Sequence, residues 1–432
     1  MRDIALTLFI FSILPFIPKR PVVGVLLFTW ISLMNPHRLT YGFAYDFPFA
    51  AIAAGLTLVS LAMSKNPKRL PMNATVVTLI LFTLWITLTT FFAMKPDLAW
   101  ADWSQAMKML LMVVVAMMAL NTKQDIIAFA WVLGISLGFY GLKGGIFTVA
   151  SGGTNNVFGP AGTNIRDNND LALALITTLP IIWYLSLHAT HKYVRLGLKG
   201  LALMTLIAAV GTYSRGALLA GGAMLFFLWL KRGQKVRNAL FLIGVVSLVL
   251  MFMPDKWFDR MDTISEYKTD SSAQGRINAW HFAFNVASDK FLGGGFRNFT
   301  SDMFMIYAPV PTDVHAPHSI YFQVMGNHGF IGLLLFLLLM LFVWRTGTRI
   351  KNLSKGNAEL KWAADLAMML QVSIVGYAVG GAFLSLAYFD LYYDIIALMI
   401  ILQKFVLIQL NPDKRNVLPT TTPLTRPGMK PS

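Results

Sequence analysis

The stretch GTYSRGALLA, residues 211–220, places an arginine between two apolar runs. LKGLALMTLIAAV precedes it and GGAMLFFLWLKR follows it. A charged side chain near the centre of a bilayer is costly, so the position of Arg215 relative to the membrane decides how the chain folds. A single helix over residues 198–230 would be about 50 Å long, whereas the hydrocarbon core of a bilayer is only about 30 Å thick.

Basic residues at both ends of this segment resolve the mismatch. Lys199 lies at its start, and Lys231 with Arg232 lies at its end. Because cytoplasmic loops are enriched in Lys and Arg, both ends are predicted to be cytoplasmic. The segment must then be a helical hairpin whose turn, TYSRG, lies at the outer membrane face. Arg215 is therefore expected at the rim of the outer surface rather than at the midplane.

The composition extends this interpretation to the whole chain. Of the 432 residues, 56% are hydrophobic and 13% are charged, whereas soluble domains carry about 25% charged residues. The formal charge of +16 is concentrated in short loops, which favours cytoplasmic loops over nucleic-acid binding. The absence of cysteine excludes disulfides and thiolate metal sites.

We expect an all-α polytopic membrane protein with about 12 or 13 transmembrane helices and one large periplasmic loop. Residues 4–17 resemble a signal-peptide core, but no cleavage pattern follows, so we expect them to be retained. Whether this segment spans the membrane by itself decides between 12 and 13 helices. The expected regions are a transmembrane bundle (1–254), the loop (255–318), C-terminal transmembrane helices (319–410) and a disordered cytoplasmic tail (411–432). Besides the hairpin, the expected spans are 4–17, 22–34, 47–63, 74–93, 104–120, 126–150, 169–187, 238–253, 319–344, 363–387 and 394–410.

The large loop contains a predicted amphipathic helix over residues 274–288. Ile277, Trp280 and Phe284 share one face at helical spacing, Arg276 starts the helix, and LGGG ends it. We expect the helix to lie along the membrane surface with its apolar face inward. Arg276 is either a contact for an anion or a solvated arginine at a helix start.

Farther along, Pro317 and His318 are expected to open a helix that runs straight into the membrane. The positive end of a helix dipole disfavours imidazolium, and a neutral imidazole can accept a proton as a general base must. A surface histidine that caps a helix is the alternative. A metal site built from His315 and His318 with His281 or His328 is another, although no compact ligand motif is visible.

Two groups of acidic residues complete the outer face. DNND at 167–170 is not an Asp-x-Asp metal pattern, and we expect it to cap a helix that starts at Leu171, with Asp170 near the N-cap. Asp390 and Asp394, in YFDLYYD, could orient an arginine or the base. An interfacial pair flanked by tyrosines is the competing interpretation.

Two arginines and a histidine at one membrane face resemble the O-antigen ligase and polymerase superfamily of bacterial membrane glycosyltransferases. The similar segments are TYSRGA, GRINAW followed by FLGGGFRNF, and HSIYFQVMGNHGFIGLLLF. MNPHRLTYGFAYDFPFA and IRDNNDLALAL resemble the branch of O-glycosylation ligases often found with exosortase systems. The resemblance covers nearly the whole chain.

The resemblance implies a membrane-embedded fold of the glycosyltransferase C type in the bacterial inner membrane. It also implies metal-independent, inverting transfer of a glycan from undecaprenyl pyrophosphate to lipid A–core at the periplasmic face, with no cofactor. By the same resemblance Arg215 and Arg276 contact the pyrophosphate, and His318 is the essential histidine. The supporting candidates are Asp390, Tyr213 and His315.

The chemistry of these residues suits the implied reaction but leaves alternatives open. Two guanidinium groups can hold phosphate oxygens bidentately, as a divalent metal does elsewhere. A growing glycan chain or a protein Ser or Thr hydroxyl could replace lipid A–core as acceptor. A transporter of lipid-linked sugars would need charges in a central cavity and often repeated halves, neither of which this sequence indicates. A non-catalytic membrane partner of an export system is a third interpretation.

Overall fold

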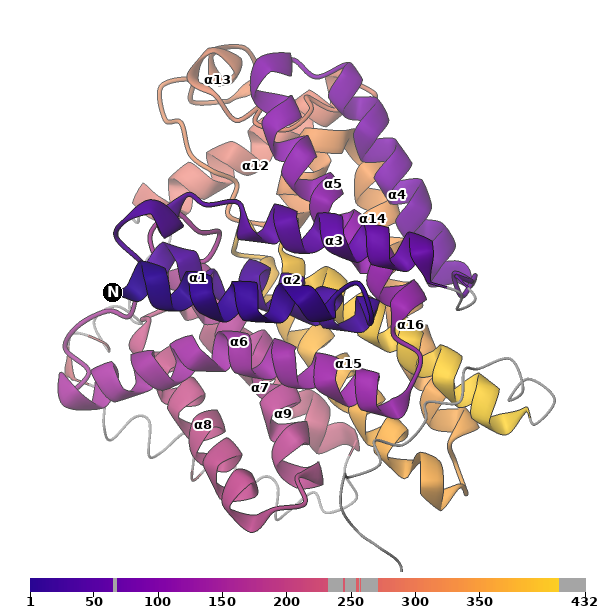
Figure 1. Ribbon diagram of the computed structural model, residues 1–432. Coiled ribbons are helices and arrows are strands. Elements are labelled where there is room, and N and C mark those ends of the chain that lie inside the picture. Colours follow the sequence, from indigo (N-terminus) through magenta and orange to yellow (C-terminus); the bar gives the residue numbers. More distant parts are fainter. Residues whose placement is uncertain (65–67, 232–243, 245–253, 256, 258–270, 412–432) are drawn as a thin grey trace, which may run out of the picture.

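The computed structural model describes residues 1–64, 68–231, 244, 254, 255, 257 and 271–411. These residues form helices joined by loops, with no strand among them, so the prediction of an all-helical membrane protein is confirmed. Figure 1 shows the arrangement. The helices, in chain order, are α1 (Arg2–Ile13), α2 (Pro21–Met34), α3 (Phe49–Met63), α4 (Ala74–Phe91), α5 (Pro96–Ala119), α6 (Lys123–Ala150), α7 (Asn168–His188), α8 (Lys192–Gly211), α9 (Arg215–Lys231), α12 (Ser271–Asp289), α13 (Ser301–Tyr307), α14 (Ile320–Leu353), α15 (Lys361–Gly381) and α16 (Asp390–Leu410).

Eight of the described helices are long and apolar enough to cross a membrane: α4 to α8 and α14 to α16. Each coincides with one of the expected spans. The segments expected at 4–17, 22–34 and 47–63 and the second hairpin arm are shorter helices, α1, α2, α3 and α9. With 12 residues, α1 is too short to cross the hydrocarbon core alone, but α2 and α3, with 14 and 15 residues, are also shorter than a typical span, so the count of 12 or 13 stays a prediction. The span expected at 238–253 and the tail after Asn411 lie outside the described residues.

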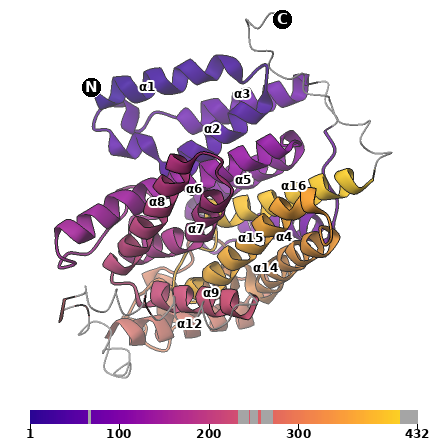
Figure 2. The ribbon, with the colours of Figure 1, turned by 90° about the horizontal axis from the view of Figure 1, so that it is seen from below.

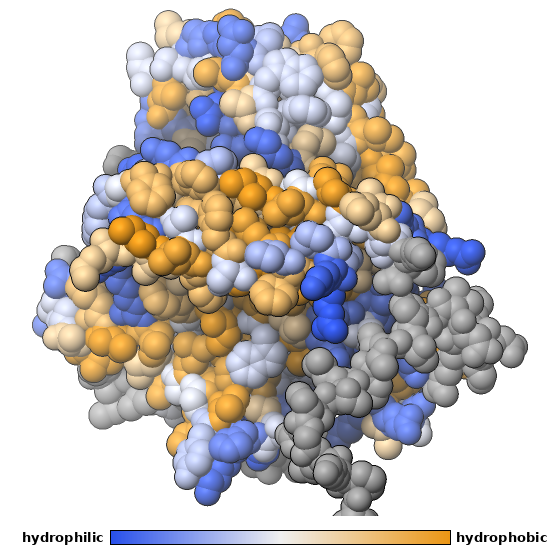
Figure 3. Space-filling view, in the orientation of Figure 1, coloured by the Kyte–Doolittle hydropathy of each residue, from blue (hydrophilic) through white to orange (hydrophobic). Residues whose placement is uncertain are grey.

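The helices are stacked in layers. Figure 2 shows α1, α2 and α3 at one side of the molecule and α9 and α12 at the opposite side. Between them, α7 and α16 are the most enclosed of the long helices, and α15 packs against α7, α9, α14 and α16. A band of hydrophobic surface crosses the face where α1, α2 and α3 lie, with hydrophilic residues above and below it (Figure 3). This pattern suits a protein surrounded by lipid at its middle.

Glycines allow the closest helix contacts. A Cβ on Gly145 of α6 would lie 2.4 Å from the carbonyl oxygen of Met204 in α8, so only glycine lets these backbones approach. Small residues at such contacts are typical of helix packing in lipid, where apolar side chains gain little by leaving the bilayer. The first arm of the hairpin is thereby fixed against α6.

Helix α14 is broken at His328 and Gly329, a feature that the sequence pattern does not predict. Gly329 has φ 67° and ψ −173°, a conformation that is essentially restricted to glycine. Phe291 lies against it: a Cβ at residue 329 would be 2.5 Å from the Phe291 carbonyl oxygen. The break divides α14 into a short N-terminal part and a longer part that can span the membrane.

The carbonyl groups freed by this break are satisfied by other segments. Gly326 accepts hydrogen bonds from the backbone of Gly294 at 2.9 Å and from the side chain of Asn298 at 2.7 Å. The backbone N–H of Gly295 donates to Asn327 at 2.8 Å, and Trp85 of α4 donates to His328 at 2.8 Å. The LGGG segment therefore does more than end α12: it holds the kink of α14.

Two other local predictions need correction. Helix α12 begins at Ser271, five residues before Arg276, and Ala279, Phe282, Ala283 and Val286 form the face that is buried within the protein. Trp280 and Phe284 contact α14 through Phe322 and Phe330.

Helix α7 begins at Asn168, before the predicted Leu171. Its N-cap is Asp167, whose carboxylate accepts a hydrogen bond from the backbone of Asn169 at 2.8 Å. Asp170 lies in the first turn instead of at the cap, because the acceptor that fits the free N–H groups is the residue just before the first helical one.

Candidate functional site

The predicted hairpin turn is present between α8 and α9. Helix α8 ends at Gly211 and α9 begins at Arg215, whose side chain is half-buried. Tyr213, in the turn, has φ 59°, and its hydroxyl donates to the carbonyl of Gly153. Tyr213 is thus a residue that fixes the turn against the loop after α6, and Arg215 is presented at the first position of α9.

His318 lies just before α14, whose N-cap is Ser319 and whose first residue is Ile320. The helix thus starts two residues later than predicted. His318 has φ 40°, a conformation that costs a non-glycine residue about 1–3 kcal/mol and persists only where neighbours impose it. One such neighbour is Trp280 of α12, whose indole N–H donates to the carbonyl of Pro317 at 2.7 Å.

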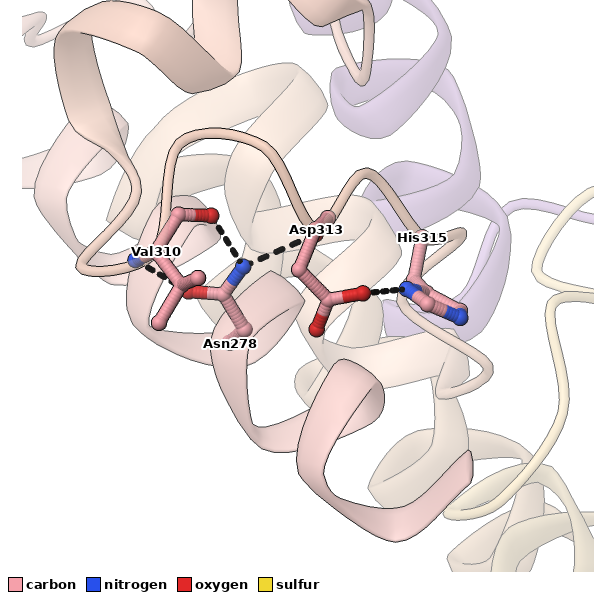
Figure 4. A network of polar contacts seen from close by, with 4 residues as sticks. All are labelled: Asn278, Val310, Asp313 and His315. Atoms are coloured by element: carbon pink, nitrogen blue, oxygen red, sulfur yellow. Dashed lines mark hydrogen bonds and ion pairs between the residues drawn. The ribbon is translucent and has the colours of Figure 1, made fainter. Parts of the chain in front are cut away.

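The segment before His318 is fixed by Asn278 of α12 (Figure 4). The Asn278 side chain donates to the carbonyls of Val310 at 2.8 Å and Asp313 at 2.9 Å, and it accepts from the N–H of Val310 at 2.9 Å. Asp313 in turn lies 2.8 Å from Nδ1 of His315. His315, a supporting candidate from the sequence, is therefore directed toward Asp313 within this segment.

The charges of Arg276, Asp167 and His315 act on His318. Burial lowers the pKa of His318, and the positive charge of Arg276 lowers it further. Asp167 opposes this by raising the pKa, and His315 adds a smaller lowering effect. A Cβ on Gly275 would lie 2.5 Å from Nδ1 of His315, so the start of α12 that carries Arg276 packs against that ring. The balance favours a neutral imidazole near neutral pH.

Other contacts bring the turn before Arg215 to the same end of the bundle. The Asn168 side chain, next to Asp167, donates to the carbonyl of Thr212 at 2.7 Å. The end of α15 lies between the starts of α9 and α14. A Cβ on Gly216 would contact Phe383 at 3.4 Å, and one on Gly381 would meet Ile320 at 2.5 Å. The three segments that carry Arg215, Arg276 and His318 therefore share a neighbourhood.

Asp390 lies elsewhere in the hydrogen-bond network. It is the first residue of α16, and its carboxylate accepts a hydrogen bond from Ser32 of α2. Asp394, one turn later, is buried within α16. The described contacts of Asp390 thus join α16 to α2 in the N-terminal layer. None of these described contacts is with His318.

The histidines of the alternative metal site are separated. His281 is exposed on α12, whereas His328 is fully buried at the kink of α14, with Nδ1 2.6 Å from the hydroxyl of Thr89. Within the described ranges, no three His, Asp or Glu side chains gather as a metal site would require. The proposed cluster of His315 and His318 with either of these histidines is therefore not assembled.

Comparison with known families places this site within a recognised region. Residues 200–337 match the family described as O-antigen ligase, and residues 1–190 match a family of unknown function, DUF5935. No curated protein matches the chain. The apolar helices indicate a multi-pass membrane protein. The family match indicates a glycosyltransferase-like function of the O-antigen ligase or polymerase type, which implies lipid-linked glycan substrates. Residues 200–337, which include Arg215, Arg276 and His318, match the O-antigen ligase family, so the resemblance inferred from the sequence is confirmed for this region.

Proposed function

We propose that this protein is an inverting glycosyltransferase of the bacterial inner membrane that moves a glycan from undecaprenyl pyrophosphate to lipid A–core at the periplasmic face. One observation carries the proposal. The turn before α9, the first half of α12 and the segment before α14 are far apart in the chain, yet they meet at one end of the bundle. All three belong to the O-antigen ligase region.

The reaction assigns each group a task. The acceptor hydroxyl attacks the anomeric carbon of the donor sugar, and its proton passes to the neutral imidazole of His318. The bond from that carbon to the pyrophosphate oxygen breaks, and the electron pair stays on the oxygen. Arg215 and Arg276 stabilise the negative charge that develops there, because guanidinium groups bind phosphate oxygens bidentately. Attack opposite the leaving group inverts the configuration.

Substitution of each residue tests these tasks. Arg215→Ala, Arg276→Ala and His318→Ala should each lower glycan transfer by about 10²-fold or more while the protein stays in the membrane. Arg195→Ala is a matched control, because Arg195 is exposed in α8 and contacts the backbone of Ala189. Full activity of any one site variant removes that residue from the proposed mechanism.

The arginine pair also makes a prediction about metal ions. If two guanidinium groups stabilise the leaving pyrophosphate, the purified enzyme should transfer glycan at an undiminished rate in EDTA. The measurement is transfer to lipid A–core before and after chelation and after addition of Mg²⁺ or Mn²⁺. A strict requirement for an added metal would contradict this mechanism.

Deletion of the gene distinguishes the acceptors. Loss of the lipopolysaccharide ladder with accumulation of lipid-linked polymer supports the ligase. Loss of a glycoprotein stain with an intact ladder would instead indicate transfer to a protein Ser or Thr hydroxyl. A ladder reduced to single repeat units would indicate polymerisation of the glycan. The assay uses a lipopolysaccharide gel and a glycoprotein stain of the same cells.

A further inference from the structure

A hollow of about 660 Å³ lies in the loop between α6 and α7, outside the O-antigen ligase region. The loop folds back on itself: the N–H of Gly159 donates to the carbonyl of Arg166 at 3.1 Å. A Cβ on Gly159 would lie 1.8 Å from the carbonyl oxygen of Ile165, so the close approach requires glycine. The side chains that line the hollow include Phe158, Thr163, Asn164, Arg166, Asp167 and Asp170.

Contacts on two sides hold this loop in place. The N–H of Val157 donates to the carbonyl of Gly211 at 3.0 Å, directly before the TYSRG turn. On the other side, a Cβ on Gly162 would lie 3.1 Å from the hydroxyl of Tyr45 and 3.6 Å from the side chain of Arg38. The loop that forms the hollow is therefore held against both the hairpin turn and the N-terminal segment.

The hollow adjoins the proposed catalytic residues. Asp167 lines it and is also close enough to His318 to influence that imidazole electrostatically. The next residue, Asn168, donates to Thr212, three residues before Arg215. The hollow thus adjoins the turn that carries Arg215, and one of its lining carboxylates acts on the charge of His318.

The lining favours a ligand rich in hydroxyl groups. The carboxylate of Asp167 accepts hydrogen bonds, Asn164 and Thr163 both donate and accept, and Arg166 donates. Oδ1 of Asp170 is buried, and no group in the described part of the chain donates a hydrogen bond to it. The Asp167 carboxylate repels a phosphate group, whereas sugar hydroxyls can donate hydrogen bonds to it. The exposed ring of Phe158 offers an apolar surface beside these polar groups.

We propose that the hollow lined by residues 158–170 is a saccharide subsite that binds a pyranose ring of a substrate. The inference rests on the proposed function and assigns two parts of the substrate to two binding places. The arginines hold the pyrophosphate, and the loop between α6 and α7 holds sugar hydroxyls. The ring comes either from the donor glycan or from the core oligosaccharide of the acceptor.

Saturation-transfer NMR on the full-length protein in nanodiscs tests the subsite with two lipid-free probes. One is the glycan released by mild acid from the host's lipid-linked donor, and the other is the core oligosaccharide released from its lipopolysaccharide. The variants are Asn164→Ala and Asp170→Asn. Asn155→Ala is the control, because Asn155 is exposed in the same loop and does not line the hollow.

We expect the wild type and Asn155→Ala to show saturation transfer to one probe, and each lining variant to bind that probe about tenfold more weakly. The probe that binds identifies the source of the ring. Absence of binding by the wild type, or unchanged binding by both lining variants, would overturn the subsite. Inhibition of glycan transfer by undecaprenyl pyrophosphate, which carries no sugar, tests the proposed function separately. That inhibition should be unchanged in Asn164→Ala and Asp170→Asn.

Discussion

At the scale of single residues, His318 lies between opposing charges. Burial and Arg276 lower its pKa from the usual value of 6.5, and Asp167 raises it. A base must be unprotonated, so kcat/KM should stay constant down to a pH below 6.5 and fall only under the lowered pKa. We therefore expect full activity above the pKa of His318. The acid limb of the pH profile, where kcat/KM falls, should lie at a pH that is unusually low for a histidine.

Asp167→Asn tests this dependence. Removal of the carboxylate removes the effect that raises the pKa of His318, so the acid limb of kcat/KM should move to lower pH. Asparagine can still cap α7, because its side-chain oxygen can accept the bond from Asn169. Asp46→Asn is the control, because the Asp46 side chain is 83% exposed and pairs with Arg38, and it should leave the limb in place. A shift to higher pH would exclude Asp167 as a neighbour that favours the imidazolium form.

The sequence predicts some features of these residues and not others. Arg215 and His318 were predicted from apolar runs, loop charges and a resemblance, and the predicted turn before Arg215 is present. The positive φ angles of Tyr213 and His318 were not predicted, because they depend on distant partners. Tyr213 is held by Gly153, and the segment ending at His318 is held by Trp280.

At the scale of elements, α12 acts as a support for the segment that precedes α14. Asn278→Ala would remove three hydrogen bonds to that segment, which we expect to loosen the position of His318. A loss of about 1–2 kcal/mol in positioning corresponds to a decrease of roughly tenfold in kcat/KM. The assay is glycan transfer by protein extracted from membranes in equal amounts.

Asn285→Ala is the matched control on the same helix. Asn285 is exposed, and its side chain donates a hydrogen bond to the carbonyl of Tyr307 at 2.8 Å. Its replacement should leave transfer near the wild-type rate. Equal losses in the two variants would mean that α12 affects activity through general stability, and the positioning role of Asn278 would be rejected.

Hydropathy predicts helix α14 but does not predict its kink. The apolar run at 319–344 predicts a helix there, and the helix is present. It contains no proline that would predict a break. The break depends on Gly293 to Gly295, which approach α14 closely with positive φ at two positions, and on Trp85 from α4. A hydropathy pattern within one segment does not report contacts with distant segments, so it could not predict this break.

At the scale of the whole molecule, the two family-matched regions form one packed unit. Asp102 of α5 accepts hydrogen bonds from Arg297 at 2.9 and 3.0 Å. Trp85 and Thr89 of α4 contact His328, and Asn168 contacts Thr212. Each pair joins residues 1–190 to residues 200–337. The spans were predicted from composition, but their pairing depends on contacts between residues that, except for Asn168 and Thr212, lie more than a hundred positions apart in the chain.

This packing predicts that a buried link between the regions matters more than an exposed one. The Thr89 hydroxyl donates to the carbonyl of Ile86 at 3.0 Å, so it accepts from Nδ1–H of His328. Thr89→Val would leave that buried donor without a partner, at a cost of about 1–3 kcal/mol. The melting temperature of the detergent-solubilised protein should fall by a few degrees, and transfer should fall because the kink supports the segment that follows His318.

Asp302→Asn provides the comparison across the same interface. Asp302 pairs with Lys95 at the surface, with side-chain exposures of 52% and 31%, and exposed ion pairs contribute about 0–1 kcal/mol. Its replacement should shift the melting temperature less than Thr89→Val does, and the shift should shrink further in high salt. If Asp302→Asn proved the more harmful, the regions would be joined mainly by surface charge. The buried contacts of α4 with the kink could then not be what holds α14 in position.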